Sequence, residues 1–331
     1  MDAPARYIFT MDELSLYFDR ICMPVAQRVY DVRFLTDHDK LAFLHLLQKH
    51  QLVKCPWENT VQHYSWHRTV TLQPSLLYNK IVRQPGRGGY CMEVNYFYHL
   101  VLYNLGFDVY MAGSRIYKVN RYGGWTHVVN IVSIRGERYL LDGGFGGQGP
   151  PRPVRLQHGI VKPQVAPADM RLLYQNIPQN LNSNQKVWIY EYRHNENSDW
   201  APMYCFTDLE FTPEDIESMN FAPSTSRHTF FTHKVVASRF TTSREVEADN
   251  LPGSPIEWAL EGEIDGSITI NHDNLKWRRR GEKVVHVVFE TDDDRVQALN
   301  KYFGITLVKE DREAIINTMA MIGVGAMGNA H

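Results

Sequence analysis

Residues 87–95 read Arg-Gly-Gly-Tyr-Cys-Met-Glu-Val-Asn, and this stretch joins a glycine-rich turn to the start of an apolar helix. The Pro85-Gly86 pair just before it ends the preceding helical segment, because proline and glycine both interrupt helices. From Cys91 onward the pattern predicts a helix to about Leu105, with Gly106 as its stop. Cys91 therefore begins a helix, where unpaired backbone N–H groups and the helix dipole stabilise a thiolate.

The periodicity of the chain changes after this helix. Before it, helical spacing and N-cap signals predict helices that begin after Thr10, after Thr36 and at Pro74. After it, alternation predicts a β-rich middle and then a mixed α/β end. The predicted later elements are a strand over 187–192, a short helix opened by Thr212-Pro213, strands over 230–236 and 284–289, a solvated turn over 276–280 and a helix over 293–303.

Bulk composition excludes several classes of protein. The chain has 331 residues, 44% of them hydrophobic, which is enough for a sizeable core and two or three structural units. Its 35 basic and 37 acidic residues leave a net charge of −2, so nothing predicts binding to nucleic acid or to a membrane surface. The four cysteines lack CxxC spacing, and we find neither a secretory signal nor an apolar run of membrane-spanning length. We expect a cytoplasmic protein with a free, reactive thiol.

A predicted β-hairpin supplies the base and the carboxylate that such a thiol needs. Two alternating segments flank Arg135-Gly136, which we interpret as a two-residue turn. This register places Asp142 opposite Val129, two residues along the same face from His127. Diagonal neighbours of an antiparallel pair lie about 7–8 Å apart at the backbone, within reach of an imidazole and a carboxylate. We therefore expect these two side chains to hydrogen-bond and to serve Cys91 as base and orienting group.

Two other motifs give weaker evidence for a functional site. Residues 144–149 match GxGxxG after a strand, but Pro150 and Pro151 follow where a dinucleotide site requires a helix. We interpret this segment as a flexible glycine loop that borders the active site. His63 and His67 have the spacing of a helical zinc pair, yet the glutamate of HExxH is missing and their flanks favour a strand. No metal site is predicted.

Residues 87–95 resemble the RGG-aromatic-Cys signature of the arylamine N-acetyltransferase family. Further segments resemble that family, namely YFDRI at 17–21, PWEN at 56–59, THV at 126–128, LDGGFG at 141–146 and IESMN at 216–220. Together the matches cover about residues 10–310, and the sequence is identified as a member of microbial or fungal type. The tail after Asp311 has no clear correspondence.

The resemblance implies an α+β fold in three regions. The first, residues 1–106, is a helical bundle that carries the nucleophilic cysteine. The second, residues 107–221, is a β-barrel domain that carries the histidine and the aspartate. The third, residues 222–331, is an α/β lid with an extended C-terminal tail.

The resemblance also implies a ping-pong acyl transfer. Cys91 takes an acyl group from a coenzyme A (CoA) thioester and passes it to an arylamine or hydrazine, with no permanently bound cofactor. His127 activates the thiol, and Asp142 fixes the histidine tautomer and stabilises the imidazolium. Acetyl-CoA is the default donor, and malonyl-CoA or propionyl-CoA are further candidates. With the charge, hydropathy and motif arguments above, we expect no nucleic-acid, membrane or metal partner and a monomer or weak oligomer.

Several other positions match family segments with known roles. The implied CoA contacts are Gly123, Gly124, Thr126, Ser226 and Thr229, and Phe145 and Thr126 are implied to face the acceptor. Glu58 and Arg87 resemble the family's structural ion pair. Gly147 stands where vertebrate relatives often carry a cation and Asn120 where they have a lysine, so CoA-phosphate contacts and acceptor range do not carry over.

The glycine loop after Asp142 would suit an acyl group larger than acetyl; the alternative is a loop that is merely flexible, with acetyl-CoA preferred. Small residues leave volume beside the thiol, and glycine backbones present N–H donors to an anion. A malonyl group fits this expectation, and Arg115 or Arg121 are the guanidinium groups that we expect to hold its carboxylate.

Three alternative functions remain open from the sequence. A papain-like cysteine hydrolase uses the same three groups but passes the acyl group to water. A non-catalytic binding module has no need to keep all three. A CoA-independent amide synthase would acylate Cys91 yet ignore free acyl-CoA.

Overall fold

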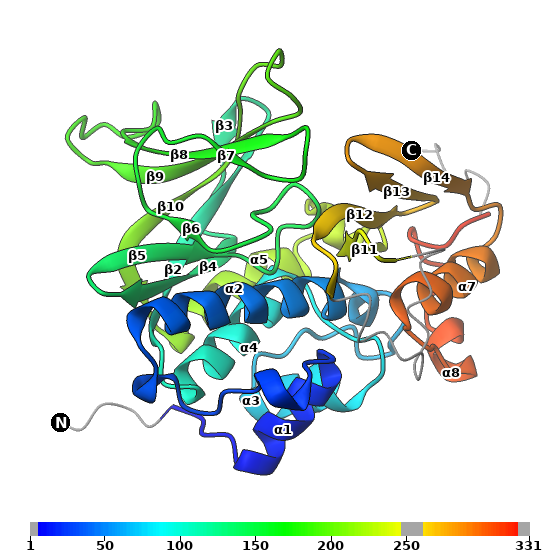
Figure 1. Ribbon diagram of the computed structural model, residues 1–331. Coiled ribbons are helices and arrows are strands. Elements are labelled where there is room, and N and C mark those ends of the chain that lie inside the picture. Colours follow the sequence, from blue (N-terminus) through cyan, green and yellow to red (C-terminus); the bar gives the residue numbers. More distant parts are fainter. Residues whose placement is uncertain (1–5, 246–260, 324–331) are drawn as a thin grey trace.

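The structure is a computed structural model that describes residues 6–245 and 261–323. Figure 1 shows a layer of helices, a curled sheet above one end of it, and a smaller sheet above the other end, flanked by the last helices. Among the described residues, no helix combines the length and the apolar character that a membrane span requires.

The first two helices of the helical layer begin at the predicted N-caps. Thr10 and Glu13 form a reciprocal capping box at the first helix, and the Thr36 side chain accepts from the Asp39 backbone N–H at the second. A wider, π-helical turn extends the third helix from Asn79 to Arg83. The four helices are α1 (Met11–Arg20), α2 (Asp37–Lys54), α3 (Pro74–Tyr78) and α4 (Cys91–Asn104), with short 3-10 turns at Val25–Gln27, Val32–Phe34 and Thr60–Gln62.

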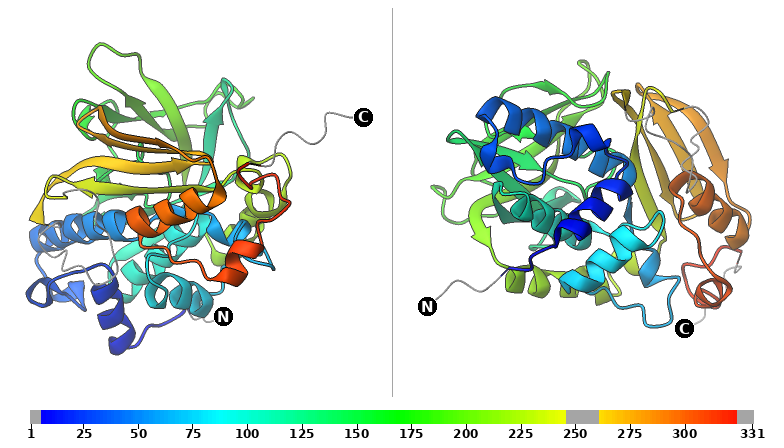
Figure 2. Two further views of the ribbon diagram at one scale, coloured as in Figure 1. Left: turned by 90° about the vertical axis from the view of Figure 1, so that its right-hand side faces the viewer. Right: turned by 60° about the horizontal axis from the view of Figure 1, so that its bottom comes forward.

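Helix α4 lies at the centre of the largest apolar core. Every residue from Cys91 to Leu102 is buried, so this helix has no solvent face. It packs against the other helices on one side and against the curled sheet on the other (Figure 2). Its polar residues Glu93, Asn95 and His99 are buried with the apolar ones. The N-terminus of α4 is therefore held inside the protein, where the curled sheet and the helices meet.

The curled sheet is open, which corrects the expected closed barrel. Its strands follow the order β6-β5-β4-β2-β10-β9-β8-β7, and among the described residues no pairing joins its two edges. Both edge strands have only two residues, too few to close a ladder. The strands are β2 (Asp108–Lys118), β3 (Arg121–Tyr122), β4 (His127–Ile134), β5 (Glu137–Leu141), β6 (Val154–Arg155), β7 (Lys162–Pro163), β8 (Asp169–Gln175), β9 (Val187–Arg193) and β10 (Ala201–Phe211).

The second sheet has the order β1-β11-β12-β13-β14. Its first strand belongs to the N-terminal hundred residues, so this pairing ties the helical layer to the C-terminal third. Its elements are β1 (Trp57–Glu58), β11 (Val236–Thr242), β12 (Ile264–Asn271), β13 (Asn274–Arg279) and β14 (Glu282–Val288), followed by α7 (Asp292–Phe303) and α8 (Lys309–Glu313). Helix α5 (Pro213–Thr225) connects the two sheets, and its Ile216 and Met219 join the core around α4.

Three expected elements differ from the structure. The basic stretch 276–280, expected as a turn, lies in β13 up to Arg279, because alternate residues Leu275 and Trp277 are buried. The strand expected over 230–236 begins only at Val236, and Phe230–Thr232 is a 3-10 turn because both phenylalanine rings pack towards Trp57. The tail after Asp311 is packed up to Gly323, since Ile315 and Ala320 are buried in the core of the second sheet, and its last eight residues lie outside the described ranges.

Candidate active site

Cys91 is the first residue of α4 and is almost completely buried, with 4% of its surface exposed. Its Sγ lies 3.7 Å from the carbonyl oxygen of Thr126, which precedes β4. The first turn of a helix presents backbone N–H groups without helical partners, and these favour negative charge on the sulfur. The position is therefore suited to a thiolate.

The glycine run before Cys91 is required by close backbone packing. A Cβ on Gly88 would lie 1.8 Å from the carbonyl oxygen of Pro56, and one on Gly86 would lie 2.2 Å from the backbone of Gly304. Gly86 also has a φ of +72°, a left-handed conformation that glycine adopts without strain. These contacts hold the turn between β1 and the end of α7, and so fix the start of α4.

The predicted hairpin register is confirmed. Arg135 and Gly136 both have positive φ, as a type I′ turn requires, and Asn130 pairs with Leu141 across β4 and β5. His127 Nε2 and Asp142 Oδ2 lie 2.8 Å apart, and both side chains are buried. The Cys91 thiol lies close enough to the imidazole to contribute to its raised pKa. Because Nε2 is engaged by the carboxylate, Nδ1 is the ring nitrogen left for the thiol.

The Asp142 carboxylate is held by more than the histidine. Its Oδ1 accepts from Asn95 Nδ2 at 2.9 Å and from the Gly144 backbone N–H at 2.8 Å. Burial alone would raise its pKa, but the charge of His127 and these hydrogen bonds outweigh burial and lower it. Asp142 is therefore ionised at neutral pH, with its orientation fixed on both oxygens.

His127 is correspondingly held in its charged form. Burial favours the neutral imidazole, but the Asp142 charge and the hydrogen bonds to Asp142 and Cys91 outweigh it and raise the pKa of His127 to about 10. The rings of Phe145 and Tyr204 pack on the imidazole, with centroids 5.8 and 5.2 Å away. A buried imidazolium beside a thiol stabilises the thiolate.

The residues that we expected to contact CoA or the acceptor lie in three parts of the structure. Thr126 contacts the thiol, and Phe145 packs on His127. Gly123 and Gly124 form the exposed approach to Thr126, between β3 and β4. Ser226 and Thr229 follow α5 and hydrogen-bond each other through their backbones, just before Phe230.

Lys118, at the end of β2, lies close to the segment that carries Ser226 and Thr229. The Lys118 ammonium lies 4.7 Å from the centroid of the Phe230 ring. Burial lowers the pKa of Lys118, and the nearby Cys91 thiol opposes that effect. The end of β2 and the segment after α5 therefore approach each other close to Cys91.

The structure bears on two expectations about the acyl pocket. The glycine loop is closely packed at two positions, because a Cβ on Gly144 would lie 2.7 Å from Cys91 Cα and one on Gly147 2.3 Å from Ser267 Oγ. Of the two candidate guanidinium groups, Arg115 stacks on Trp125 at 3.9 Å and donates to the Gly123 carbonyl at 3.0 Å, and Arg121 is exposed in β3.

The expected ion pair between Glu58 and Arg87 is confirmed, with Arg87 Nε 3.1 Å from Glu58 Oε1. Glu58 also accepts from the Thr60 backbone N–H and hydroxyl, and Lys80 lies 3.8 Å away. Burial opposes ionisation, but Arg87, Lys80 and these hydrogen bonds lower the pKa of Glu58 to about 2. The pair lies beneath the turn that leads to Cys91 and has a structural role.

The weaker motifs have structural explanations. The element that follows the GxGxxG segment is strand β6, so the helix of a dinucleotide site is absent there. His63 Nε2 donates to the Phe231 carbonyl at 2.8 Å, and burial lowers the pKa of His63 to about 4. His67 Nδ1 accepts from the Thr69 backbone N–H. Each histidine therefore has a local protein partner.

Sequence reasoning missed three residues around Asp142. Asn95 holds the carboxylate, Gln48 donates to the Asp142 carbonyl at 3.3 Å, and the buried Tyr204 packs on His127. Asn95 could have been found, because residues four apart on a helix share a face and Asn95 follows Cys91 at that spacing. Gln48 and Tyr204 come from distant segments that only the fold brings together.

Comparison with known proteins gives consistent matches. An N-acetyltransferase family model matches residues 40–249, which include Cys91, His127 and Asp142. The N-malonyltransferase FDB2 of Fusarium pseudograminearum is 30% identical over 342 residues, covering 95% of this chain and 94% of that protein. Arylamine N-acetyltransferase 2 of Mus musculus is 30% identical over 236 residues, covering 68% of this chain and 77% of that protein.

Solved structures share the fold. The structure of Mycobacterium marinum arylamine N-acetyltransferase in complex with CoA has a TM-score of 0.69 and 22% sequence identity, covering 91% of this chain and 98% of that chain. The curled sheet and the helical layer are therefore an arrangement that solved members of one enzyme family also have.

Proposed function

Because this chain belongs to the arylamine N-acetyltransferase family, and is therefore an acyltransferase, we propose that it acylates arylamines through an acyl-cysteine at Cys91. The observation that carries this proposal is the buried, hydrogen-bonded pair His127–Asp142 beside Cys91 at the start of α4. Three such groups in this order activate a thiol as a nucleophile.

The first half-reaction forms the acyl-enzyme. The Cys91 thiolate attacks the carbonyl carbon of the CoA thioester, and the electron pair of the C=O bond moves onto oxygen. Collapse of this tetrahedral intermediate reforms C=O and breaks the bond to the CoA sulfur. The His127 imidazolium donates its proton to the departing thiolate, and CoA leaves as a thiol. Backbone N–H groups at the α4 N-terminus favour the negative charge that develops.

The second half-reaction returns the enzyme to its starting state. The amine attacks the acyl-cysteine carbonyl, and neutral His127 takes the proton that the nitrogen loses. Collapse of the second intermediate expels the Cys91 thiolate and releases the amide. Asp142 stabilises the imidazolium that forms in each cycle and does not itself accept the proton.

The donor assignment rests on a relative and on the site. FDB2, named for malonyl transfer, aligns with 95% of this chain, which supports malonyl-CoA as a donor beside acetyl-CoA. Lys118, close enough to Cys91 to interact with it electrostatically, is a cation able to hold a malonyl carboxylate. We propose Lys118 for this role in place of Arg115, whose guanidinium stacks on Trp125.

The contacts for the rest of the substrates remain predictions. We propose that Gly123, Gly124, Thr126, Ser226 and Thr229 border the thioester end of CoA at the mouth of the site. Phe145, whose ring packs on His127, is the proposed contact for the aromatic ring of the acceptor.

Mass spectrometry of the intact protein tests the function. After mixing with acetyl-, propionyl- or malonyl-CoA and no acceptor, we expect the mass of one acyl group on the peptide that contains Cys91. Adding an arylamine should remove that mass and produce the amide. A papain-like hydrolase would instead lose the acyl group to water at the same rate without amine, and a CoA-independent synthase would gain no mass from acyl-CoA.

A further inference from the structure

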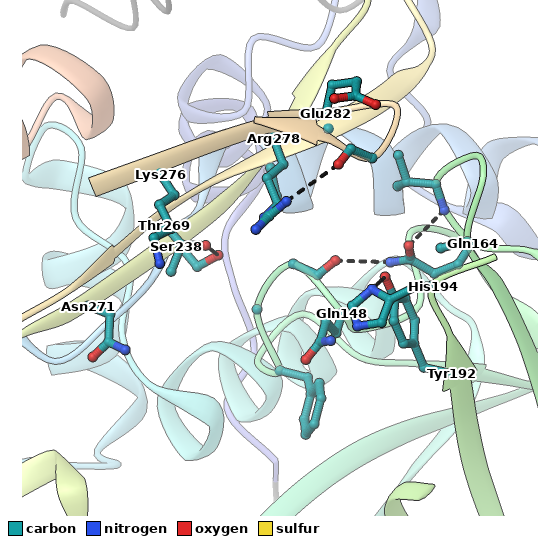
Figure 3. Close-up of a pocket in the computed structure, with 18 of the residues that line it drawn as sticks. Gln148, Gln164, Tyr192, His194, Ser238, Thr269, Asn271, Lys276, Arg278 and Glu282 are labelled. Atoms are coloured by element: carbon teal, nitrogen blue, oxygen red, sulfur yellow. Dashed lines mark hydrogen bonds between the residues drawn. The ribbon is translucent and has the colours of Figure 1, made fainter. Parts of the chain in front are cut away.

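The catalytic group has an open side and a buried side. On the open side, a cleft of about 860 Å³ lies between the curled sheet and the second sheet. One wall includes Gln148 and His194, and the other is the open face of β11, β12 and β13 (Figure 3). Trp57 and Phe145 line its inner end. Of the described residues that line this cleft, none belongs to α4. Side chains further along α4 can therefore affect the reaction only through the residues that they hold.

The buried side is a row of polar contacts between α4 and β4, which we call the polar seam. Its helix residues Cys91, Asn95 and His99 are spaced four apart and share one face of α4. Asn95 donates to the Val128 carbonyl at 2.7 Å, and Asn130 Nδ2 donates to the Asn95 carbonyl at 2.9 Å. Four helical residues advance about 6 Å and two strand residues about 6.8 Å, so α4 and β4 stay in step along the seam.

The seam ends at His99, which meets the N-terminal arm, residues 6–10. Arg6 Nη1 donates to His99 Nε2, and Arg6 Nη2 donates to Glu210 at 3.0 Å. Burial and the Arg6 charge lower the pKa of His99 to about 3, so the imidazole is neutral at pH 7. A guanidinium can only donate, so Nε2 is the acceptor and Nδ1 carries the proton.

His99 and Asn130 offer each other a complementary donor and acceptor. Asn130 uses its Nδ2 for the Asn95 carbonyl, which leaves its Oδ1 as an acceptor. Within the part of the chain that the structure describes, neither His99 Nδ1 nor Asn130 Oδ1 has another partner, although both atoms are buried. The Asn130 side chain lies close enough to His99 to raise its pKa against the effect of burial. With Nδ1–H facing Oδ1, the Asn130 amide cannot reverse, because its oxygen would then face the Asn95 carbonyl.

We propose that Arg6 and His99 are positioning residues that fix the Asn130 amide from the far end of the seam. Asn130 then holds the Asn95 backbone, and the Asn95 side chain holds the Asp142 carboxylate. The proposal rests on the proposed function, since Asp142 belongs to its catalytic group. The N-terminal arm is thereby connected to the active site through four buried side chains, although it contacts none of the reacting groups.

A polar seam fixes a position that apolar packing leaves adjustable. Helix α4 is covered on all sides, so a small shift along β4 would expose little apolar surface. Each hydrogen bond of the seam, by contrast, is satisfied at only one offset of the helix on the strand. His99 lies eight residues after Cys91, about 12 Å along the axis at 1.5 Å per residue. A misplacement of the thiol by about 1 Å can slow a reaction by up to about 100-fold.

The test compares His99→Met with His99→Gln, which introduce unbranched side chains of nearly equal size. Glutamine presents one acceptor and one donor on a planar group, as the neutral imidazole does, so it can serve Arg6 and Asn130 together. Methionine can serve neither. We expect kcat for acetyl-CoA to fall about tenfold in His99→Met and to stay within about twofold of wild type in His99→Gln. The KM for acetyl-CoA should be unchanged in both, because His99 does not line the cleft.

Alkylation of Cys91 by iodoacetamide at pH 6.5 supplies a readout that needs no acyl donor. It should slow in His99→Met and recover in His99→Gln, because the position of the thiol beside its base sets the rate. Arg6, whose side chain is 23% exposed, allows the same comparison without a core substitution. Arg6→Lys keeps a donor and should retain activity, whereas Arg6→Met should lose it. The losses in Arg6→Met/His99→Met should not add, since both variants break one chain of contacts.

Equal kcat in His99→Met and His99→Gln overturns the proposal. So does a His99→Met variant with a lower melting temperature but wild-type kcat and alkylation rate, because the seam would then only stabilise the fold. Additive losses in the double variant, or an unchanged Arg6→Met, overturn the role of Arg6. If the wild type forms no acyl-enzyme while alkylation still differs between the methionine and glutamine variants, the proposed function alone is refuted.

Discussion

Asn95 lies one helical turn after Cys91 and donates a 2.9 Å hydrogen bond to Asp142, so a single helix carries both the nucleophile and the group that holds the orienting carboxylate. The nitrogen and the oxygen of the Asn95 side-chain amide both have further hydrogen-bond partners. Its Nδ2 also donates to the Val128 carbonyl at 2.7 Å, and its Oδ1 accepts from the Gly143 backbone N–H at 2.7 Å. Asn95 thereby joins α4, β4 and the loop after β5.

We expect Asn95→Ala to lower kcat by about 10- to 100-fold, the usual cost of losing a partner that orients a catalytic group. The KM for acyl-CoA should stay within a few-fold, because Asn95 has no contact with the cleft. The pH at which the acylation rate falls on the alkaline side should also move down, because Asp142 would stabilise the His127 imidazolium less well. Steady-state kinetics from pH 6 to 10 measure both effects. Asn104→Ala, at the far end of α4, is the matched control, and an equal loss in that variant would indicate a general effect on the helix.

Cys91→Ser should abolish acyl-enzyme formation, because a serine hydroxyl is far less acidic than the thiol that His127 activates. The other three cysteines supply controls, since all are free thiols outside the Cys91–His127–Asp142 group. Cys22→Ser should leave turnover within a few-fold of wild type. The measurement is the release of CoA in the first turnover, and a burst in Cys91→Ser would disprove the assignment of the nucleophile.

How much of this site was predictable depends on the sequence separation of its parts. His127 and Asp142 are fifteen positions apart in one hairpin, and the turn Arg135-Gly136 sets their register locally. The approach of Thr126 to Cys91 needs the packing of α4 on β4, which no local pattern specifies. The family resemblance, not the periodicity, predicted that Cys91 shares one site with the hairpin that carries His127 and Asp142.

The second sheet, by contrast, was not predictable from local sequence. The basic stretch 276–280 carries alternating buried residues, Leu275 and Trp277, but its charges favoured a solvated turn over a strand. A strand with one polar face is recognisable only when the other face has a partner, and here that partner is α7, which begins at Asp292, beyond the next strand. The cleft that this face lines is therefore a property of the fold, invisible in local sequence.

Asp142→Asn provides a test of the charge state of His127. The raised pKa of His127, about 10 against about 6.5 in the unfolded chain, contributes stability that is fully present below pH 6.5 and is lost as pH rises through about 10. We expect the free energy of unfolding in urea to fall between pH 7 and 10 in the wild type. The asparagine variant lacks the anion that raises this pKa, so its slope over that range should be smaller. Parallel slopes in the two proteins would contradict a buried imidazolium.

The same variant should change the reactivity of the thiol. With His127 charged, iodoacetamide should alkylate Cys91 rapidly at pH 6.5, where an ordinary thiol with a pKa of about 8.5 is almost wholly protonated. In Asp142→Asn we expect the rapid reaction to be lost at pH 6.5 and to reappear only at higher pH. Peptide mapping assigns the label to Cys91, and slow labelling of wild type at pH 6.5 would show that no activated pair exists.

The last prediction concerns the acyl donor. If Lys118 holds the malonyl carboxylate, Lys118→Met should lower kcat/KM for malonyl-CoA by about tenfold relative to acetyl-CoA, which has no such charge, because one charge-assisted contact is lost. Methionine keeps an unbranched apolar stem of similar length but removes the ammonium that lies over the Phe230 ring. Lys301→Met, on α7, controls for loss of a positive charge away from the acyl site. The assignment fails if Lys118→Met slows both donors equally, and the malonyl proposal itself fails if wild type prefers acetyl-CoA by more than tenfold with one arylamine acceptor.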